Sequence, residues 1–376
     1  MTRVLLVTND FPPTLGGIQS YLRDFVDTLP AEDLVVFASV QDAEAARAWD
    51  ARQPYKVIRW PVKMMLPTLA TARRMQEIIR EEKIDTVWFG ASAPLALMAS
   101  WAKKAGAKRV VASTHGHEVG WSMLPGARQA LKIIGRDCDA ITYIAEYTLG
   151  RFARAFGGRR KFVHLPSGVS VTDFVPVAEE ERERLRSELG WEGEGPFIVC
   201  ISRLVPRKGQ DRLIEALPEV LRAFPNAQLV LVGGGSYEKR LRELAQGLED
   251  PVSFLGRVDD DVMKKAMQAA TVFAMPARTR GKGLDVEGLG IVYLEAQACG
   301  IPVLAGDSGG APETVTPESG VVVRGNDVEA IADALKRILS DPAAARQMGM
   351  AGRRNVEKRW TWEIMGKRLR DVLSVN

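Results

Sequence analysis

The segment 196–209, PFIVCISRLVPRKG, carries a clear strand–loop–helix pattern. Pro196 is followed by an apolar, β-favouring run at 197–201 and then by a loop that holds three cations. A helical pattern begins after Gly209. A short apolar run that leads through a polar loop into a helical pattern is typical of one unit of a parallel α/β sheet.

The same unit recurs along the whole chain. Strands are predicted downstream at 228–232, 252–255, 272–275, 302–305 and 320–323, and upstream at 4–8, 34–39, 56–60, 86–90, 109–114, 140–144 and 161–165. Helical patterns separate them, for example at 18–29, 69–82 and 94–104. Such alternation indicates parallel sheets with helices on both faces.

An acidic and polar stretch at 176–195 interrupts the pattern, which then restarts. We therefore predict an α/β protein with two doubly wound domains, 1–170 and 171–358. An amphipathic segment at 359–376 is predicted to pack back across the domain junction. A length of 376 residues agrees with two domains. Ligands of such sheets bind outside the carboxyl ends of the strands, so the expected site is a cleft between the domains.

The composition excludes several classes of protein. With 46% hydrophobic and 26% charged residues, the chain is neither disordered, collagen-like nor a disulfide scaffold. Cys138, Cys200 and Cys299 lie far apart in the sequence, which fits a reducing compartment. The longest uncharged run is shorter than the roughly 20 apolar residues of a spanning helix. The apolar run at 4–7 is too short for the core of a signal peptide. We therefore expect a cytoplasmic location.

The net charge of +4 conceals an asymmetry. Residues 1–170 hold 23 Lys and Arg against 16 Asp and Glu, a net charge of +7, whereas residues 171–376 hold 28 against 31, a net charge of −3. A basic first half favours an anionic partner, although scattered surface lysines and arginines are an equally good explanation.

Two loops indicate binding of an anion. The first loop, at 9–17, ends in Gly16-Gly17 before a helix, where backbone N–H groups can approach an anion or a sugar closely. A plain flexible turn is the alternative there. The second loop, at 202–209, places Arg203, Arg207 and Lys208 before a helix. Cations oppose the positive end of that helix dipole unless a phosphate binds to both, and solvated surface charge is the alternative.

Two further loops contain glycine. The sequence VGGGS at 232–236 lacks the third glycine of a dinucleotide fingerprint and is a weak signal of close ligand approach. The sequence DVEGLGIVYLE at 285–295 is more informative, because Glu287 and Glu295 flank a glycine-rich helix start. If this segment were helical throughout, the eight residues would span about 12 Å, enough to reach both ends of a nucleotide sugar.

Acidic and imidazole side chains at two positions are candidates for metal ligands or catalytic groups. The triplet Asp259-Asp260-Asp261 contains an Asp-x-Asp metal motif, but its position before a helical run favours capping of the helix N-terminus. His115 and His117 directly follow a predicted strand, where ligands of such sheets bind. A packing or capping role is as plausible there as a functional one.

These features in this order resemble the retaining glycosyltransferases of family GT4, which have the GT-B fold of two Rossmann-like domains. The resemblance covers the whole chain: the Gly-Gly loop, the histidine loop, the Arg203 and Lys208 pair, and the two glutamates eight residues apart. The stretches TNDFPPTLGGIQSYL, THGHEVGWSMLPG and MPARTRGKGLDVEGLGIVYLEAQACG are similar to those of the actinobacterial phosphatidylinositol-mannoside mannosyltransferases.

The resemblance implies a role for each matching position. Arg203 and Lys208 would bind the diphosphate of the donor, Glu287 the hydroxyls of the donor sugar, and His117 the sugar near its reacting carbon; these four are the implied catalytic residues. Further donor contacts would come from Gly16, Gly17, Gly233, Arg257, Val258, Gly288, Leu289, Gly290, Ile291, Val292 and Glu295. Of these, Glu295 would bind the ribose, and Arg257 with Val258 would flank the base. Asp10 and Gln19 are the implied acceptor contacts.

The implied reaction transfers mannose from GDP-mannose to a phosphatidylinositol mannoside, with retention and an expected α-1,6 linkage. No metal or other cofactor is required in this scheme, since cationic side chains stabilise the leaving diphosphate. A family member that uses a UDP-sugar or another lipid or soluble acceptor remains an alternative, because the phosphate-binding residues would be the same. A nucleotide- or polyanion-binding module without catalysis is a second alternative. It leaves Glu287 and Glu295 unexplained, so we expect no nucleic-acid partner.

A lipid acceptor would give the basic first half a purpose. The segment 58–74, IRWPVKMMLPTLATARR, combines four cations with apolar residues that the sequence pattern suggests are exposed, namely Trp60, Met64, Met65, Leu66 and Leu69. Such a segment is suited to the surface of an anionic membrane, while an ordinary loop and helix packed on the sheet is the alternative. We therefore expect a cytoplasmic protein that contacts the inner face of the plasma membrane through its N-terminal domain.

Overall fold

The computed structural model describes residues 2–14, 16–159, 161–248 and 251–375. The chain forms two compact units. Unit 1 comprises Met1–Ser167 and Trp362–Asn376, and unit 2 comprises Gly168–Thr361. The sequence pattern predicts the corresponding boundaries at 170 and 358. The C-terminal segment is thus grouped with unit 1.

Within its described residues, unit 1 contains a seven-stranded sheet in the order β3-β2-β1-β4-β5-β6-β7. All neighbouring strands are parallel. The strands are β1 (Val4–Thr8), β2 (Leu34–Ala38), β3 (Lys56–Arg59), β4 (Thr86–Phe89), β5 (Arg109–Ser113), β6 (Ala140–Tyr143) and β7 (Phe162–His164). Every residue of β1, β2 and β4 is buried, as expected for strands covered on both faces.

The helices of unit 1 connect these strands. The α-helices are α1 (Gly17–Val26), α2 (Ala43–Asp50), α3 (Leu69–Glu81), α4 (Ala99–Lys104), α5 (Glu118–Met123), α6 (Pro125–Asp137), α7 (Glu146–Phe152) and α15 (Trp362–Leu373), with 3₁₀ turns η1 (Ala31–Asp33), η2 (Leu95–Met98) and η3 (Ala153–Phe156). In α1 the buried residues Tyr21, Leu22, Phe25 and Val26 recur at helical spacing. They therefore form one apolar face on the sheet.

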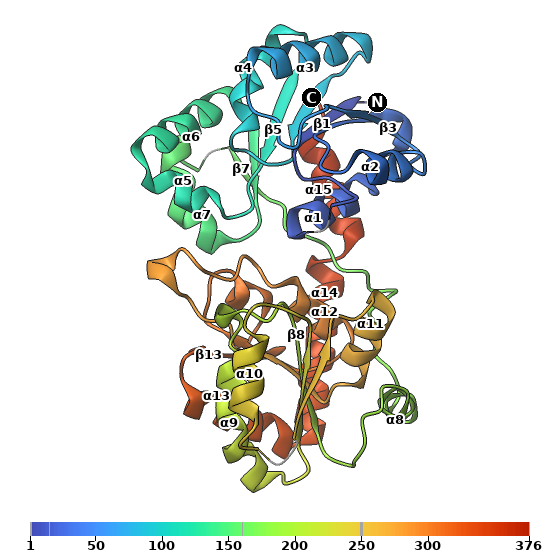
Figure 1. The fold of residues 1–376 in the computed structure, drawn as a ribbon, viewed down its shortest axis with the longest axis vertical. Coiled ribbons are helices and arrows are strands. Elements are labelled where there is room, and N and C mark those ends of the chain that lie inside the picture. Colours follow the sequence, from blue (N-terminus) through green and yellow to red (C-terminus); the bar gives the residue numbers. More distant parts are fainter. Residues whose placement is uncertain (1, 15, 160, 249–250, 376) are drawn as a thin grey trace. The chain divides into compact units, whose positions relative to one another are not determined.

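Helix α15 returns the end of the chain to unit 1. Figure 1 shows it, in red, beside the first helix of the chain, in blue. The Phe25 and Trp362 rings meet edge to face at 5.2 Å between centroids. The carbonyl oxygen of Leu373 accepts a hydrogen bond from Thr86 Oγ1 at 2.8 Å, and that of Val372 accepts one from Arg109 Nε at 2.6 Å. The last turn of α15 is therefore fastened to β4 and β5.

The segment after β3 differs from the sequence-based expectation at two positions. Met65 is buried, with 0% of its surface exposed, because Asn9 accepts a hydrogen bond from its N–H at 2.6 Å and donates one to its carbonyl at 3.0 Å. Trp60 is half-buried, and its ring packs against Phe37 at 6.0 Å. The prediction that Met65 and Trp60 are exposed is therefore wrong. The prediction is confirmed for Met64, Leu66 and Leu69, which are 62%, 50% and 64% exposed.

Unit 2 contains, in its described residues, a six-stranded parallel sheet in the order β10-β9-β8-β11-β12-β13. Its strands are β8 (Phe197–Ile201), β9 (Gln228–Val232), β10 (Val252–Gly256), β11 (Val272–Met275), β12 (Val303–Gly306) and β13 (Gly320–Val323). Its α-helices are α8 (Glu179–Glu188), α9 (Gln210–Ala223), α10 (Glu238–Ala245), α11 (Asp260–Ala269), α12 (Ile291–Ala298), α13 (Val328–Ser340) and α14 (Pro342–Arg359), with 3₁₀ turns η4 (Pro206–Lys208), η5 (Gly281–Gly283) and η6 (Ala311–Thr314).

Both sheets have the doubly wound arrangement that the alternation of strands and helices predicts, so the predicted fold class is confirmed. In each sheet the strand order reverses next to the first strand, between β1 and β4 in unit 1 and between β8 and β11 in unit 2. The loops that follow these strands diverge to opposite sides of the sheet and leave a crevice. The loops after β8 and β11 are therefore the natural place for a ligand of unit 2.

Candidate active site

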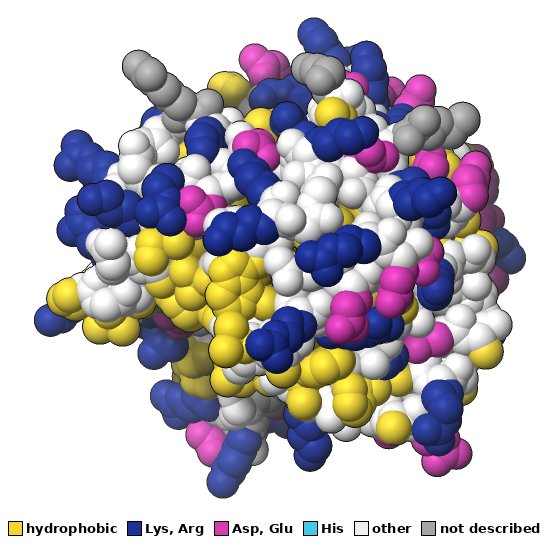
Figure 2. Space-filling view, turned by 90° about the horizontal axis from the view of Figure 1, so that it is seen from above, with side chains coloured by type: hydrophobic (Ala, Val, Ile, Leu, Met, Phe, Trp, Pro, Cys, Tyr) yellow, Lys and Arg dark blue, Asp and Glu magenta, His cyan; other side chains and the backbone are white. Residues whose placement is uncertain are grey.

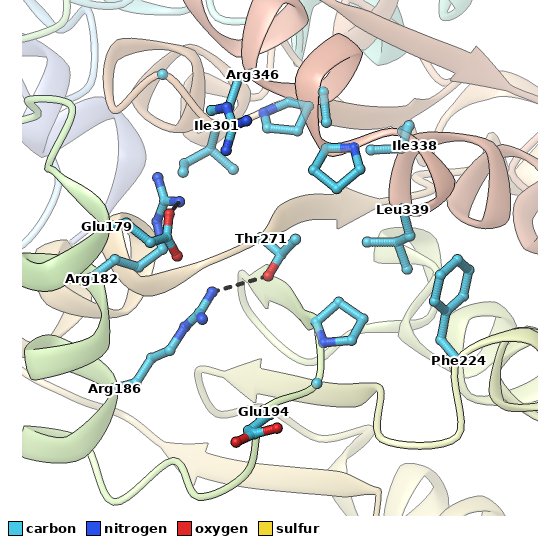
Figure 3. Close-up of a pocket in the computed structure, with 16 residues that line it drawn as sticks. Glu179, Arg182, Arg186, Glu194, Phe224, Thr271, Ile301, Ile338, Leu339 and Arg346 are labelled. Atoms are coloured by element: carbon cyan, nitrogen blue, oxygen red, sulfur yellow. Dashed lines mark hydrogen bonds and ion pairs between the residues drawn. The ribbon is translucent and has the colours of Figure 1, made fainter.

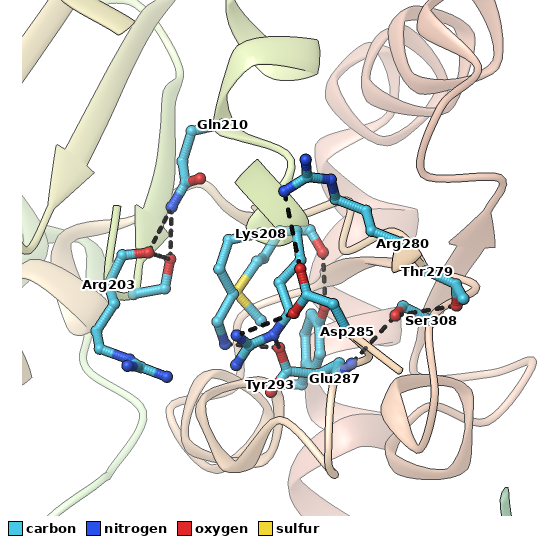
Figure 4. Close-up of polar contacts among 12 residues, drawn as sticks. Arg203, Lys208, Gln210, Thr279, Arg280, Asp285, Glu287, Tyr293 and Ser308 are labelled. Atoms are coloured by element: carbon cyan, nitrogen blue, oxygen red, sulfur yellow. Dashed lines mark hydrogen bonds and ion pairs between the residues drawn. The ribbon is translucent and has the colours of Figure 1, made fainter. Parts of the chain in front are cut away.

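The cationic loop after β8 meets the acidic loop after β11. Lys208, in η4, lies 2.7 Å from Glu287 through its Nζ and the Oε2 of the glutamate (Figure 4). Lys208 is 8% exposed and Glu287 is 6% exposed. The N–H of Glu287 also donates to Ser308 Oγ at 3.1 Å. Two residues predicted to bind different parts of one donor are thus brought into direct contact.

A glycine permits this close approach of the two loops. Gly209 follows Lys208 with a φ of +80°, and a Cβ at this position would lie 2.1 Å from the carbonyl oxygen of Pro276. Only glycine tolerates both the left-handed backbone and this contact. The position of Lys208 beside the loop after β11 therefore depends on the sequence Lys208-Gly209.

A second buried ion pair supports the same loops. The two terminal guanidinium nitrogens of Arg278, Nη1 and Nη2, donate to the carboxylate of Asp211 at 2.7 and 2.8 Å. The hydroxyl of Tyr237 donates to the same carboxylate at 3.2 Å. The N–H of Arg278 donates to the carbonyl of Arg207 at 2.8 Å. The pair thus joins the start of α9 to the loop after β11. No local sequence pattern predicts this pair, because Asp211 and Arg278 lie 67 residues apart.

Arg203 differs from Lys208 in having no carboxylate within ion-pair distance among the described residues. Its carbonyl accepts a hydrogen bond from Gln210 Nε2 at 3.1 Å, and its side chain is exposed. Figure 4 shows the guanidinium pointing away from that backbone contact. Arg203 can therefore reach a ligand without first breaking an ion pair.

The remaining predicted donor residues lie on neighbouring loops of unit 2. In the glycine loop, a Cβ on Gly233 would lie 2.0 Å from the carbonyl oxygen of Ser202, so this glycine is needed for packing of the two loops. The side chain of Arg257 lies against Gly234, and Val258 follows it after β10. The structure gives the glycine at 233 a packing reason that the sequence pattern alone does not provide.

The segment 285–295 is only partly helical. The predicted span of about 12 Å assumes a helix over all eight residues from Glu287 to Glu295, so that span does not apply. Helix α12 begins at Ile291, after Gly290 with a φ of +83°. Glu287 therefore lies in a loop with Gly288 and Leu289, while Val292 and Glu295 lie on the helix. Tyr293, on α12, is buried. Its burial is the main cause, and the charge of Glu287 the second, that raises the pKa of its hydroxyl well above the usual value. Its hydroxyl stays protonated and donates to the carbonyl of Met275 at 2.5 Å.

In unit 1 the predicted acceptor residues lie together. Gln19 Nε2, in α1, donates to Asp10 Oδ1 at 3.0 Å. Gly16 precedes α1 and Gly17 is its first residue. Among the described residues, a Cβ on Gly17 would meet nothing within 4 Å, whereas a Cβ on Gly16 would lie 2.3 Å from Gln19 Oε1.

The two predicted histidines have different surroundings. His115 Nε2 makes a 2.7 Å hydrogen bond to the carbonyl of Gly90, and burial lowers the pKa of His115. His117 precedes α5, and its side chain is 39% exposed. Its Nε2 lies 3.3 Å from Oε1 of Glu118, which is fully buried. Glu118 was not predicted, although the sequence THGHE places it directly after His117.

Comparison with known proteins places this geometry in a family. Residues 15–173 match the model of "Glycosyltransferase Family 4" and residues 181–355 match that of "Glycosyl transferases group 1". The chain is 60% identical to a Corynebacterium glutamicum protein named GDP-mannose-dependent monoacylated alpha-(1-6)-phosphatidylinositol monomannoside mannosyltransferase, over 99% of this chain and 97% of the relative. The chain belongs to glycosyltransferase family 4.

Other similar proteins agree with this assignment. A Mycolicibacterium smegmatis GDP-mannose-dependent alpha-(1-6)-phosphatidylinositol monomannoside mannosyltransferase is 52% identical to the glycosyltransferase, over 99% of this chain and 98% of the relative. The crystal structure of Anabaena HepE in complex with UDP has a TM-score of 0.81 at 20% identity, and each chain is 99% covered. Sucrose-phosphate synthase from Thermosynechococcus elongatus has a TM-score of 0.78 at 22% identity, over 99% of this chain and 98% of that one. These structures share the GT-B fold.

A separate pocket of the glycosyltransferase lies at the opposite edge of the unit 2 sheet. It has a volume of about 330 Å³ and is lined by residues that precede β8, β11 and β12 and by residues of α8, α13 and α14 (Figure 3). Arg186 in this pocket donates to the carbonyl of Ala269 at 2.9 Å and to Thr271 Oγ1 at 3.0 Å. These contacts tie α8 to the end of α11, so they explain Arg186 as a structural residue.

The acidic triplet of the glycosyltransferase caps a helix. Asp259 accepts a hydrogen bond from the N–H of Val262 at 2.9 Å, and Asp260 and Asp261 lie in the first turn of α11. The prediction of a capping role is confirmed. Among the described residues, no group of three or more His, Cys, Asp and Glu side chains is arranged to hold a metal ion.

Proposed function

We propose that this glycosyltransferase moves mannose from GDP-mannose to a phosphatidylinositol mannoside, forming an α-1,6 linkage with retention at the anomeric carbon. The observation that supports it best is the buried Lys208–Glu287 pair beside the exposed Arg203, at the point where the strand order of unit 2 reverses. This site offers cations for a diphosphate and a carboxylate for sugar hydroxyls. The relatives that match nearly the whole chain are GDP-mannose-dependent mannosyltransferases.

In the proposed mechanism, Arg203 and Lys208 bind the two phosphates of the donor. They stabilise the charge that develops as the bond from the anomeric carbon to the phosphate oxygen breaks. Glu287 accepts hydrogen bonds from the mannose hydroxyls and Glu295 from the ribose, while His117 contacts the sugar near the anomeric carbon. The acceptor hydroxyl attacks from the face that the diphosphate leaves, and its proton passes to the departing phosphate oxygen.

Metal-independent turnover is part of this proposal. The two cationic side chains take the place that a divalent ion has in other transferases. We expect turnover to continue in the presence of EDTA. Loss of turnover in EDTA, with recovery on addition of Mg²⁺ or Mn²⁺, would contradict this part of the proposal.

Choice of nucleotide is tested by thermal-shift titration with GDP, UDP, GDP-mannose and UDP-glucose. A ligand that binds only the folded state stabilises it by about 2.7 kcal/mol at a hundred times its dissociation constant. We expect GDP and GDP-mannose to raise the melting temperature at lower concentration than UDP and UDP-glucose. The opposite order would support a UDP-sugar transferase instead. A radiolabelled mannose assay with phosphatidylinositol mannosides of different acylation then identifies the acceptor.

We also propose that unit 1 contacts the cytoplasmic face of an anionic membrane, where the lipid acceptor lies. Met64, Leu66 and Leu69 form an exposed apolar group, and Lys63, Arg73 and Arg74 lie close to them in the sequence. Figure 2 shows one face of the molecule on which Lys and Arg side chains are spread widely, with hydrophobic side chains among them. Such a surface suits peripheral binding to anionic lipid. Among the described residues, no helix is long and apolar enough to cross a bilayer.

A further inference from the structure

The carboxylate of Glu118 is buried beside the imidazole of His117. Glu118 is the first residue of α5, and 0% of its surface is exposed. Its Oε2 accepts hydrogen bonds from the N–H groups of His115 at 3.1 Å and Gly116 at 3.0 Å. Its Oε1 accepts one from Ser92 Oγ at 2.8 Å. Three donors thus compensate the loss of solvent around this carboxylate.

The fourth neighbour of the carboxylate is His117. The Nε2 atom of His117 lies 3.3 Å from Oε1 of Glu118. This is the distance of an ion pair, and a lone pair on Nε2 would face the negative charge of the carboxylate, so the carboxylate favours a hydrogen on this nitrogen. In a neutral imidazole with a hydrogen on Nε2, Nδ1 keeps its lone pair. The contact with Glu118 therefore determines which nitrogen of His117 can accept a hydrogen bond from a ligand.

We propose that Glu118 is a positioning residue that holds His117 in its Nε2–H tautomer, so that Nδ1 accepts a hydrogen bond from a hydroxyl of the transferred sugar. The inference rests on the proposed function, in which His117 contacts the donor sugar. His117 is suited to this role because it is 39% exposed and follows β5, at the carboxyl edge of the unit 1 sheet. His115 is not, because its ring is largely enclosed and already bonded to Gly90.

A purely structural role for Glu118 is the competing explanation, since its hydrogen bonds with the N–H groups of His115 and Gly116 stabilise the turn before α5. The variant Glu118→Gln separates the two explanations. Its side-chain carbonyl can still accept from the N–H groups of His115 and Gly116. Its amide NH₂ cannot accept a hydrogen bond from Nε2–H of His117, and it can instead donate to an unprotonated Nε2. The variant therefore keeps both backbone contacts, reverses the direction of the hydrogen bond with Ser92 Oγ, to which the NH₂ can donate, and reverses the tautomer.

Nitrogen-15 NMR of the imidazole rings tests the tautomer without any turnover. The chain has three histidines, and the signals of His117 are those lost in His117→Ala. We expect Nε2–H for His117 in the unsubstituted protein and a shift toward Nδ1–H in Glu118→Gln. An Nδ1–H tautomer in the unsubstituted protein, or an unchanged tautomer in the folded variant, would overturn the proposal. The tautomer in the unsubstituted protein is measured without any variant, so this outcome does not depend on whether Glu118→Gln folds.

A double-mutant cycle tests whether Glu118 acts through His117. We expect Glu118→Gln to lower kcat/KM for GDP-mannose about tenfold, the loss of one hydrogen bond to the substrate, with GDP affinity unchanged. In the His117→Ala background the same substitution should change kcat/KM less than about twofold. Equal losses in both backgrounds would overturn the proposal. Glu181→Gln, at an exposed carboxylate of α8 in unit 2, is the matched control. It should change neither kcat/KM for GDP-mannose nor the affinity for GDP.

The two proposals fail in different ways. If the unsubstituted enzyme transfers no mannose from GDP-mannose to any phosphatidylinositol mannoside, the proposed function is wrong. The NMR measurement still decides whether Glu118 controls the tautomer of His117. If mannose transfer is observed but the tautomer is unaffected by Glu118→Gln, the positioning role alone is wrong.

Discussion

Units 1 and 2 hold their buried charges in different ways. In unit 2, buried charges pair with each other: Lys208 with Glu287 and Arg278 with Asp211. In unit 1, the buried carboxylate of Glu118 is held by two backbone N–H groups and the hydroxyl of Ser92. An ion pair can exchange partners when a charged ligand arrives, whereas a carboxylate bound to the backbone keeps its position. Unit 2 is therefore suited to bind a diphosphate, and unit 1 to orient a neutral sugar hydroxyl.

Lys208→Met tests the ion pair of unit 2, because it keeps the apolar stem and removes the charge. We expect turnover to fall about 10²- to 10³-fold, because one preorganised charge at the leaving group is lost. We also expect the free energy of unfolding of unit 2 to fall by up to about 3–5 kcal/mol, since Glu287 loses its nearest cation and keeps Arg207, whose Nε lies 3.8 Å from Oε2. Steady-state kinetics and urea denaturation measure the two effects.

Two further variants separate stability from catalysis at this pair. Lys208→Met combined with Glu287→Gln removes both charges and should regain most of the lost stability without regaining turnover. Lys239→Met, on an exposed lysine of α10 in unit 2, should leave both measurements unchanged. Turnover within threefold of normal in Lys208→Met would rule out the diphosphate role of Lys208.

The second variant, Asp211→Asn, tests the supporting pair. We expect it to destabilise unit 2 by about 3–5 kcal/mol, because Arg278 keeps its charge in a buried position without a carboxylate. Glu118→Gln in unit 1 should cost less, since its amide retains the backbone contacts. Hydrogen-exchange mass spectrometry reports the two units separately. A larger loss from Glu118→Gln than from Asp211→Asn would reverse the comparison between the units.

The loops of the site were easier to predict from the sequence than the contacts within them. Apolar runs and turn residues act locally, so the strands were identified correctly, and so was the strand-to-helix connection after β8 and the start of a helix within 285–295. The Asp211–Arg278 pair depends on two loops that meet only after the sheet of unit 2 forms. The role of Glu118 was not predicted, because its burial depends on the turn before α5. No local sequence pattern indicates that this carboxylate is buried. Met65 was predicted to be exposed because its contact with Asn9 spans 56 residues.

The corrected burial of segment 60–69 leads to the third prediction. Replacing Met64, Leu66 and Leu69 together by Ser should weaken binding to liposomes of anionic lipid at least about tenfold, because exposed apolar side chains lose their favourable insertion. Binding of GDP, which we propose occurs in unit 2, should be unchanged. Sedimentation with liposomes measures the first and thermal shift the second. Unaltered sedimentation would remove this segment from the proposed membrane contact.

Met65→Ser is the informative partner of that triple variant. Because Met65 is fully buried, its replacement should lower the free energy of unfolding of unit 1 by about 2–5 kcal/mol, as large-to-small core substitutions do. The triple variant should change stability by less than about 1 kcal/mol. Similar stability losses from both would show that the exposed group is also part of the core.

The smallest expected effect is a pH dependence that distinguishes the units. All three histidines lie in unit 1, and burial lowers the pKa of His115. In the unfolded chain this imidazole takes up a proton near its ordinary pKa of about 6.5, whereas the folded protein resists protonation until lower pH. The free energy of unfolding of unit 1 should therefore fall as the pH drops below about 6.5, by at most about 1.4 kcal/mol per pH unit for this group.

His115→Gln should make the free energy of unfolding of unit 1 less dependent on pH, which hydrogen exchange at pH 5.5 and 7 measures. Unit 2 has no histidine and should show little change over the same interval; an equal slope in both units would mean that His115 does not cause it.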